Sequence, residues 1–216
     1  MHKSTGPRVK ICGMTSLEDA LFTAHAGADA IGFILYDKSK RYIEPQKAVE
    51  IACQLPPFIQ RVAVTVNMDI DAILQLSLSG AFDLWQLHGD ESPEFSHQLR
   101  AQGLRTIRAL GLPLEDAFAT RLSDFDVDGF LLDKSSEHYG GTGETFDWKL
   151  AQQFMDKVVK LNKPCILAGG LSPENVVQAI AAVQPYAVDV CSGVEKEYGV
   201  KDHQKIEEFI KLCRQR

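Results

Sequence analysis

Apolar and polar residues follow one another along this chain in a repeating order: a short apolar run, a turn, and then a segment with helical spacing. Eight apolar runs recur at intervals of roughly 20 to 30 residues, which is typical of repeated βα units. Their residues are almost continuously apolar, as expected for strands that are covered on both faces. We predict strands at residues 9–12, 30–34, 62–66, 84–87, 105–109, 129–132, 165–168 and 187–190.

Helix-start signals lie between these strands. Ser16 precedes an acidic pair and is predicted to cap the first helix, Pro45 opens the second, and Asp69 opens the third. Residues 172–174, Ser-Pro-Glu, are predicted to open the seventh helix, and the last helix is expected over about 202–213. The glycines expected to cap helix C-termini are Gly27 and Gly80.

Eight strands, each followed by a helix, predict a closed (β/α)8 barrel of the TIM type. A doubly wound open sheet, the alternative, more often has about five to seven strands and a single Gly-rich first loop. The length of 216 residues fits one barrel, so we predict a single α/β domain over 1–216, with 1–8 as a short polar extension. Functional residues are then expected at the C-terminal ends of the strands and in the loops that follow.

The composition narrows the classes of function. With 23 basic and 29 acidic side chains the formal charge is -6, which argues against general nucleic-acid binding. The five cysteines are scattered and never in C-x-x-C spacing, so neither a disulfide framework nor a zinc cluster is indicated, and we expect a reducing cytoplasm. No long apolar stretch predicts secretion or membrane insertion.

Two residues with acid–base chemistry follow predicted strands. Cys12 ends the first strand and is followed by Gly13, which allows a sharp turn; Asp133 follows three apolar residues of the sixth. A buried apolar role for the thiol, or a capping or salt-bridged role for the carboxyl, is the plain alternative. At the mouth of a barrel, however, a thiol faces substrate, and we expect neighbouring groups to lower the pKa of Cys12 until it works as a base.

Three Gly-rich segments follow the last three strands, at residues 139–143, 168–171 and 191–194. The loops after strands seven and eight often bind phosphate in this fold, through backbone N–H groups. Each segment alone is compatible with a plain turn. Together, in this position, they favour an anionic phosphate ligand.

Two further loops carry polar candidates. The loop after the second strand holds Lys38, Lys40 and Arg41; solvation accounts for the two lysines, whereas the planar fork of Arg41 suits a carboxylate. The fourth strand brings Gln86 and His88 to the rim of the barrel. For His88, a role in fixing the loop geometry is weighed slightly above a catalytic one.

Several of these segments together resemble the phosphoribosylanthranilate isomerases along nearly the whole chain. The similar stretches are KICGMT at 10–15, AGADAIGF at 26–33, RYI at 41–43, QLHGDE at 86–91, GGTGETFDW at 140–148, LAGGLSPEN at 167–175 and VDVCSGVE at 188–195. Other ribose-phosphate barrels share the phosphate loops but not this combination.

The resemblance implies an Amadori rearrangement of N-(5'-phosphoribosyl)anthranilate in tryptophan biosynthesis. Asp133 matches the general acid that protonates the ribose ring oxygen, and Cys12 matches the base that removes the C2' proton. The iminium formed on ring opening is the electron sink, so no cofactor and no metal is implied. The implied partner is a small-molecule substrate, with no nucleic acid and no membrane, and the chain is expected to be a monomer, with a homodimer as the alternative.

The resemblance also assigns substrate-binding positions. Arg41 matches the family residue near the anthranilate carboxylate, and Asp189 lines the substrate site in a role left open. Two departures are visible: Cys191 stands where the family commonly has serine, and residues 135–138 replace a more Gly-rich stretch. The residues that match the loops around the phosphate are Gly143, Gly169, Gly170, Ser192 and Gly193.

Two alternatives remain at this point. One is another ribose-phosphate barrel, such as the isomerase of histidine synthesis, in which two aspartates are expected, or indole-glycerol-phosphate synthase, in which a lysine and glutamates are expected. The other is a binding module for phosphosugars without catalysis, against which the pair of Cys12 and Asp133 argues.

Overall fold

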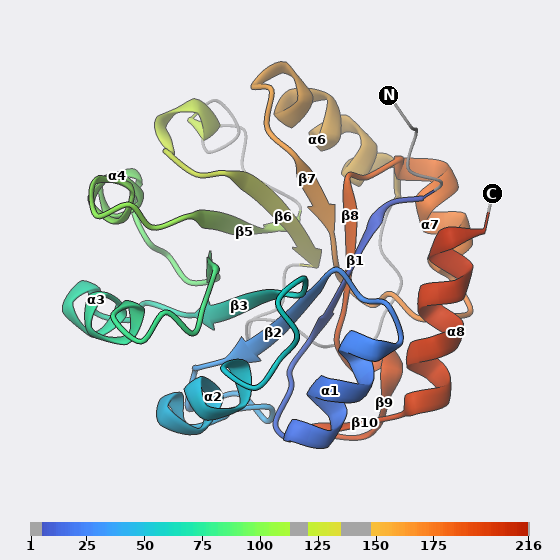
Figure 1. Cartoon of the computed structure of the whole chain (residues 1–216). Coiled ribbons are helices and arrows are strands. Elements are labelled where there is room, and N and C mark those ends of the chain that lie inside the picture. Colours follow the sequence, from blue (N-terminus) through green and yellow to red (C-terminus); the bar gives the residue numbers. More distant parts are fainter. Residues whose placement is uncertain (1–5, 113–120, 135–147, 216) are drawn as a thin grey trace.

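The computed structural model is a closed barrel of eight parallel strands, which confirms the predicted fold class. The structure describes residues 6–112, 121–134 and 148–215. Strand β1 pairs in parallel with β8 as well as with β2, and this seam closes the barrel (Figure 1). The strands are β1 (Arg8–Cys12), β2 (Ala30–Ile34), β3 (Gln60–Thr65), β4 (Leu84–Leu87), β5 (Thr106–Leu112), β6 (Gly129–Lys134), β7 (Cys165–Leu167) and β8 (Ala187–Val190).

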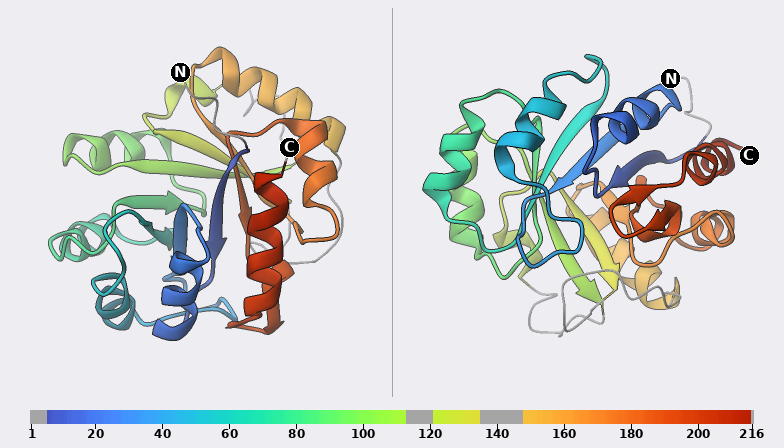
Figure 2. Two further views of the ribbon diagram at one scale, coloured as in Figure 1. Left: turned by 45° about the vertical axis from the view of Figure 1, so that its right-hand side comes forward. Right: turned by 90° about the horizontal axis from the view of Figure 1, so that it is seen from below.

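Helices surround the barrel on the outside, as both views of Figure 2 show, and α8 packs beside α1 and α7. The α-helices are α1 (Leu17–His25), α2 (Pro45–Ala52), α3 (Ile70–Ser77), α4 (Pro93–Ala101), α6 (Trp148–Lys160), α7 (Val176–Val183) and α8 (His203–Arg214). Among the described residues, none of the helices has the length and apolar character needed to cross a bilayer.

Local signals set most helix ends where the sequence predicts them. The side chains of Ser16, Asp69 and Asp202 each accept a hydrogen bond from a backbone N–H in the first turn of α1, α3 and α8. Gly27 and Gly80 have φ values of 96° and 63°, the left-handed conformation that ends α1 and α3.

The predicted start of the seventh helix is wrong by about one turn. Helix α7 begins at Val176, after a turn at residues 173–175, and the Asn175 side chain binds the backbone of the preceding loop. Its Oδ1 accepts from the backbone N–H of Ser172 at 2.9 Å, and its Nδ2 donates to the backbone oxygen of Gly170 at 2.9 Å. These residues therefore belong to the loop after β7.

Four short elements, three after β8 and one before β6, were not predicted. A 3₁₀ helix, η2 (Ser192–Val194), leads into an antiparallel hairpin of β9 (Glu195–Glu197) and β10 (Val200–Lys201), and a second 3₁₀ helix, η1 (Leu122–Asp124), precedes β6. These strands are two or three residues long, too short for a pattern of alternation to reveal them.

The core has two layers, and the strands alternate between them. Along β6, Phe130 and Leu132 lie in the outer layer between strands and helices, whereas Leu131 lies in the inner layer that fills the barrel. Along β1, Ile11 faces outward and Cys12 inward. Successive side chains of a strand point to opposite faces, so both layers together fix which residues face the barrel axis.

The outer layer supports a first prediction. Replacing Leu99 of α4, which is 0% exposed, with alanine should cost roughly 2–5 kcal/mol of unfolding free energy because it leaves a cavity between helix and strands. The matched control is Leu78→Ala at the C-terminal end of α3, where the side chain is 78% exposed and the cost should stay within about 0.5 kcal/mol. Urea denaturation measures both; equal costs would contradict the layer assignment.

Candidate active site

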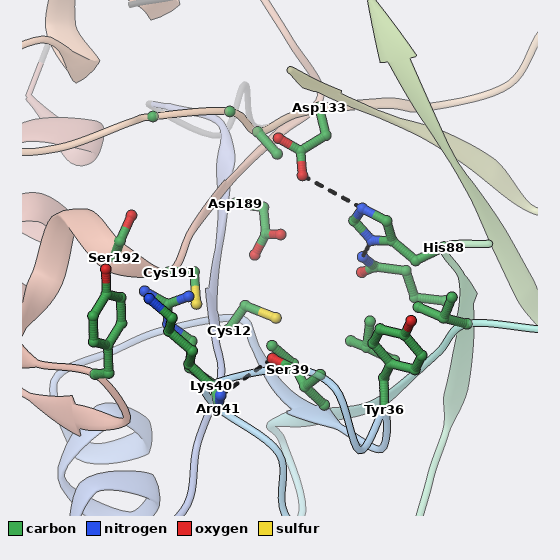
Figure 3. Close-up of a pocket in the computed structure, with 18 of the residues that line it drawn as sticks. Cys12, Tyr36, Ser39, Lys40, Arg41, His88, Asp133, Asp189, Cys191 and Ser192 are labelled. Atoms are coloured by element: carbon green, nitrogen blue, oxygen red, sulfur yellow. Dashed lines mark hydrogen bonds and ion pairs between the residues drawn. The ribbon is translucent and has the colours of Figure 1, made fainter. Parts of the chain in front are cut away.

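A cavity of about 430 Å³ lies at the C-terminal ends of the strands (Figure 3). Gly193 is not among the residues that line this cavity, and Gly143 lies outside the described residues. The other predicted site residues line it together: Cys12, Arg41, Gln86, His88, Asp133, Gly169, Gly170, Asp189 and Ser192.

Strand alternation brings the thiol and the carboxyl into this cavity. Cys12 continues the inward set of β1, and Asp133 follows Leu131 by two residues on β6, so both side chains point toward the barrel axis. Figure 3 shows them reaching the same space from different strands. The two strands are separated by β7 and β8 in the barrel.

Asp133 has a neighbour that the sequence did not indicate. Its Oδ2 lies 3.4 Å from Nε2 of His88, and Nδ1 of His88 lies 2.8 Å from Nε2 of Gln86. With Gln86 donating to Nδ1, the imidazole carries its proton on Nε2 and can donate toward Asp133. The three side chains form one chain of polar contacts along the wall between β4 and β6.

Cys12 lies beside a second thiol, Cys191, and the expectation for its pKa is wrong. A hydrogen bond with Cys191, together with burial, raises the pKa of Cys12 well above its usual value, and the nearby Lys10 opposes this only in part. The same hydrogen bond, aided by Lys201 and Arg41, lowers the pKa of Cys191 to about 7 although burial opposes this. Within the pair, Cys191 is therefore the more acidic thiol.

A buried ion pair lies below the two thiols. Nζ of Lys10 is 2.9 Å from Oδ1 of Asp189, and both side chains are almost fully buried inside the barrel. The charge of Asp189 raises the pKa of Lys10 against the effect of burial, so the lysine stays cationic. Asp189 therefore meets a protein cation, a partner that the sequence left open.

Gly32 on β2 provides the space that this arrangement needs. A Cβ atom at Gly32 would lie 2.7 Å from Sγ of Cys12 and 3.2 Å from Cε of Lys10. No residue with a side chain fits there unless the thiol and the lysine shift.

Arg41 is held by protein groups rather than left open for substrate. Its Nε and Nη2 donate to the carboxylate of Glu195 at 2.8 and 2.7 Å, and Nζ of Lys201 lies 3.1 Å from the same carboxylate. The edge of the guanidinium that contains Nε is thus occupied. The sequence predicted that the guanidinium would bind both oxygens of a substrate carboxylate. It did not reveal Glu195, which lies in the hairpin after β8.

The loops after β7 and β8 pack directly on each other. Gly169 and Gly170 have φ values of 83° and 72°, which favour glycine, and a side chain at Gly193 would collide with the backbone oxygen of Leu171. The absence of a side chain at Gly193 therefore allows the two loops to lie close together. Ser192, beside it, lines the cavity.

The rim contains cations and aromatic rings that sequence reasoning did not select. Lys38 and Lys40, which were assigned to solvent, line the cavity, as do Tyr36 and Tyr198. Nζ of Lys40 lies 4.2 Å from the centre of the Tyr198 ring. The three basic residues at 38–41 in one loop were the available signal; the position of Tyr198 depends on the unpredicted hairpin.

Comparison with known proteins places this site in a family. The family model of N-(5'-phosphoribosyl)anthranilate (PRA) isomerase matches residues 9–212. The chain belongs to this family. The N-(5'-phosphoribosyl)anthranilate isomerase of Thermotoga neapolitana is 46% identical over 207 residues, covering 96% of this chain and 98% of the relative.

Two solved structures of the family are similar over the same length. Phosphoribosyl anthranilate isomerase from Thermotoga maritima superposes with a TM-score of 0.87 at 45% identity, covering 96% of this chain and 98% of the other. A phosphoribosyl anthranilate isomerase in complex with reduced 1-(o-carboxyphenylamino)-1-deoxyribulose 5-phosphate has a TM-score of 0.83 at 42% identity, with the same coverage.

The buried network around Glu195 yields a second prediction. Although burial disfavours its charge, hydrogen bonding to Arg41 and the charge of Lys201 lower the pKa of Glu195. Glu195→Gln leaves both cations poorly compensated and should cost roughly 3–5 kcal/mol of unfolding free energy near neutral pH. Glu207→Gln, on the exposed face of α8, is the matched control and should change little.

The pH dependence of this cost has a defined sign. A carboxylate whose pKa is lowered on folding contributes stability above its unfolded value of about 4.3, and this is lost as pH falls through the folded value. The difference between wild type and Glu195→Gln should therefore be largest above about pH 5 and shrink below about pH 4. A difference that grows on acidification would contradict the network.

Proposed function

We propose that this chain catalyses the Amadori rearrangement of N-(5'-phosphoribosyl)anthranilate to 1-(2-carboxyphenylamino)-1-deoxyribulose 5-phosphate, a step of tryptophan biosynthesis. One observation carries the proposal: a thiol on β1 and a carboxyl on β6 face a single cavity whose edge is formed by the Gly-rich loops after β7 and β8. Family membership supports the same reaction.

Ring opening is assigned to Asp133. Its carboxyl donates a proton to the ribose ring oxygen, the C1'–O bond breaks, and the anilino nitrogen supplies the electrons for a protonated Schiff base. His88 is assigned as the positioning residue, because its imidazole meets the carboxyl from β4 and is itself oriented by Gln86.

Proton removal from C2' is assigned to Cys12, with Cys191 as the final acceptor. The C2' proton moves to the sulfur of Cys12 while the proton that Cys12 shares with Cys191 moves to Cys191. The electrons of the C2'–H bond flow into the iminium, which becomes an enolamine and then tautomerises to the ketone. The substrate's own iminium serves as electron sink, so the proposal requires no metal and no cofactor.

Substrate binding is assigned to opposite parts of the cavity. Backbone groups of Gly169, Gly170, Ser192 and Gly193 are proposed to hold the phosphate, with Gly143 as a further candidate outside the described residues. The anthranilate carboxylate is proposed to lie near Arg41, whose pKa is raised and whose charge persists in spite of burial because Glu195 orients it.

Asp189 is proposed to act through Lys10 rather than on substrate. Its carboxylate keeps a cation beneath Cys12, and this cation favours negative charge on the sulfur.

The remaining expectations concern the protein as a whole. We propose a small molecule as the partner in turnover and the cytoplasm as the location. A single domain and a monomeric state, with a homodimer as the alternative, stay predictions. Sedimentation velocity of the purified protein distinguishes monomer from dimer.

The acid and the base yield a third prediction. Cys12→Ser and Asp133→Asn should each lower kcat by about 10²–10⁴-fold, because each removes one proton-transfer group, while KM changes little. The loss of anthranilate-type fluorescence on addition of freshly made substrate measures both. Cys53→Ser, an exposed thiol, and Asp156→Asn, an exposed carboxyl on α6, are matched controls that should keep full activity.

Full activity in either site variant would remove that residue from the mechanism. Fluorescence that decays no faster with wild-type protein than with buffer would leave the phosphosugar-binding module without catalysis as the better description.

The chain of Gln86, His88 and Asp133 yields a fourth prediction. If His88 acts by positioning Asp133, His88→Gln should lower kcat in the wild-type background but have little further effect in the Asp133→Asn background. Urea denaturation of the same variants separates this effect from unfolding. Additive losses in the double variant would show that His88 acts independently of Asp133.

A further inference from the structure

Cys12 and Cys191 occupy matching positions on neighbouring strands. Ile11 of β1 pairs with Val190 of β8. Cys12 directly follows Ile11, and Cys191 directly follows Val190. Neighbouring strands lie about 4.8 Å apart, within the range of about 4.4–6.8 Å between the Cα atoms of disulfide-bonded cysteines. The backbone geometry therefore suits a bridge between the two positions.

Both cysteines line the same cavity. Each thiol shifts the pKa of the other, and Figure 3 shows both side chains in the cavity below Asp189, with Cys191 beside Arg41. Glycines leave room around them: a Cβ at Gly13 would lie 2.8 Å from Sγ of Cys191, and Gly32 leaves the corresponding room beside Cys12.

The charges around the pair favour a reactive thiolate on Cys191. Nζ of Lys201 lies 4.0 Å from Sγ of Cys191, and Arg41 adds a second positive charge. Asp189 and Glu195 are the opposing carboxylates, but each is bound to a cation, Lys10 and Arg41 respectively. Cys191 is also partly exposed, so a small reagent in the cavity can reach it.

The other cysteines lack this combination. Burial raises the pKa of Cys165 and of Cys213 to about 12 each, which suppresses their thiolate forms. Cys53 is exposed and does not line the cavity.

We propose that Cys12 and Cys191 form an oxidisable dithiol, which peroxides convert to an intramolecular disulfide. The Cys191 thiolate attacks one peroxide oxygen, the O–O bond breaks, and the departing hydroxide takes a proton to become water. The sulfur of Cys12 then attacks the resulting sulfenic sulfur, which forms the S–S bond and releases a second water that carries the Cys12 proton. Each sulfur loses one electron, and the peroxide accepts both.

The bridge removes the base of the proposed reaction. A disulfide sulfur is not a thiolate and is too weak a base to accept the C2' proton. Turnover therefore stops until a thiol reductant cleaves the S–S bond. This consequence for turnover rests on the proposed function; the formation of the bridge does not.

The test uses the full-length, reduced protein and hydrogen peroxide. Before alkylation the intact mass should fall by two hydrogen atoms. When the oxidised protein is then unfolded and alkylated, three thiols should be labelled instead of five, and peptide mapping should link Cys12 to Cys191. Turnover should fall by about tenfold or more and return on addition of dithiothreitol.

Two variants make the result specific. Cys53→Ser should form the same bridge as wild type, whereas Cys191→Ser should form no bridge at the same peroxide dose. The activity of each protein is compared with that of its own reduced form, so a change in basal turnover does not affect the comparison. Iodoacetamide labelling of the reduced wild type should modify Cys191 before Cys12.

The possible results distinguish failure of the dithiol proposal from failure of the proposed function. A bridge that involves Cys53, an unchanged thiol count at a dose that oxidises free cysteine, or a bridge that persists in Cys191→Ser would overturn the proposal. If the reduced protein shows no isomerase activity, the proposed function fails, while thiol counting and peptide mapping still decide whether the dithiol exists.

Discussion

The two-residue repeat of the β-strand is the constraint on which this site depends. Ile11 and Val190 face the helices, so Cys12 and Cys191, one residue further along, face the barrel axis. A slip of one residue in β1 would place Ile11 in the cavity and the thiol among the helices. Such a slip would also move Lys10 into the outer apolar layer and separate it from Asp189 inside the barrel, so the packing of both layers opposes it. Packing on two faces therefore determines where the chemistry lies.

Buried charged side chains beside these two apolar layers form ion pairs with one another. The buried partners Lys10 and Asp189 are 179 residues apart and Arg41 and Glu195 are 154 apart, while Lys201 adds a second cation beside Glu195. Such pairs contribute little net stability, since desolvation offsets much of their attraction, but breaking one leaves an uncompensated charge. Their effect here is positional: each pair holds a cation beside one of the two thiols. The seam between β1 and β8 is thus both the closure of the barrel and the place where the sulfur chemistry is controlled.

The sequence predicted the features that depend on local pattern. The barrel, the strand ends at Cys12 and Asp133 and the caps at Ser16 and Asp69 follow from periodicity and from residue types within a few positions. What failed depends on contacts across the fold. The partner of Arg41 lies 154 residues away on a hairpin too short to predict. The pKa of Cys12 moved opposite to expectation because the largest influence on it comes from Cys191, a residue 179 positions away, and no pattern along the chain links the two.

A thiol at position 191, where the resemblance to the family leads us to expect serine, changes what the first strand's cysteine can do. A serine hydroxyl in the same place can accept a hydrogen bond, but it does not ionise near neutral pH and cannot bond covalently to sulfur by oxidation. With cysteine, the hydrogen-bond acceptor is also the more acidic thiol, so it can take the base's proton during turnover. The same low pKa makes it the first sulfur to react with an oxidant. Proton transfer and oxidation therefore depend on the same property, the lowered pKa of Cys191, to which Lys201 and Arg41 contribute. A chain that gains a proton acceptor in this position gains sensitivity to peroxide by the same physical cause.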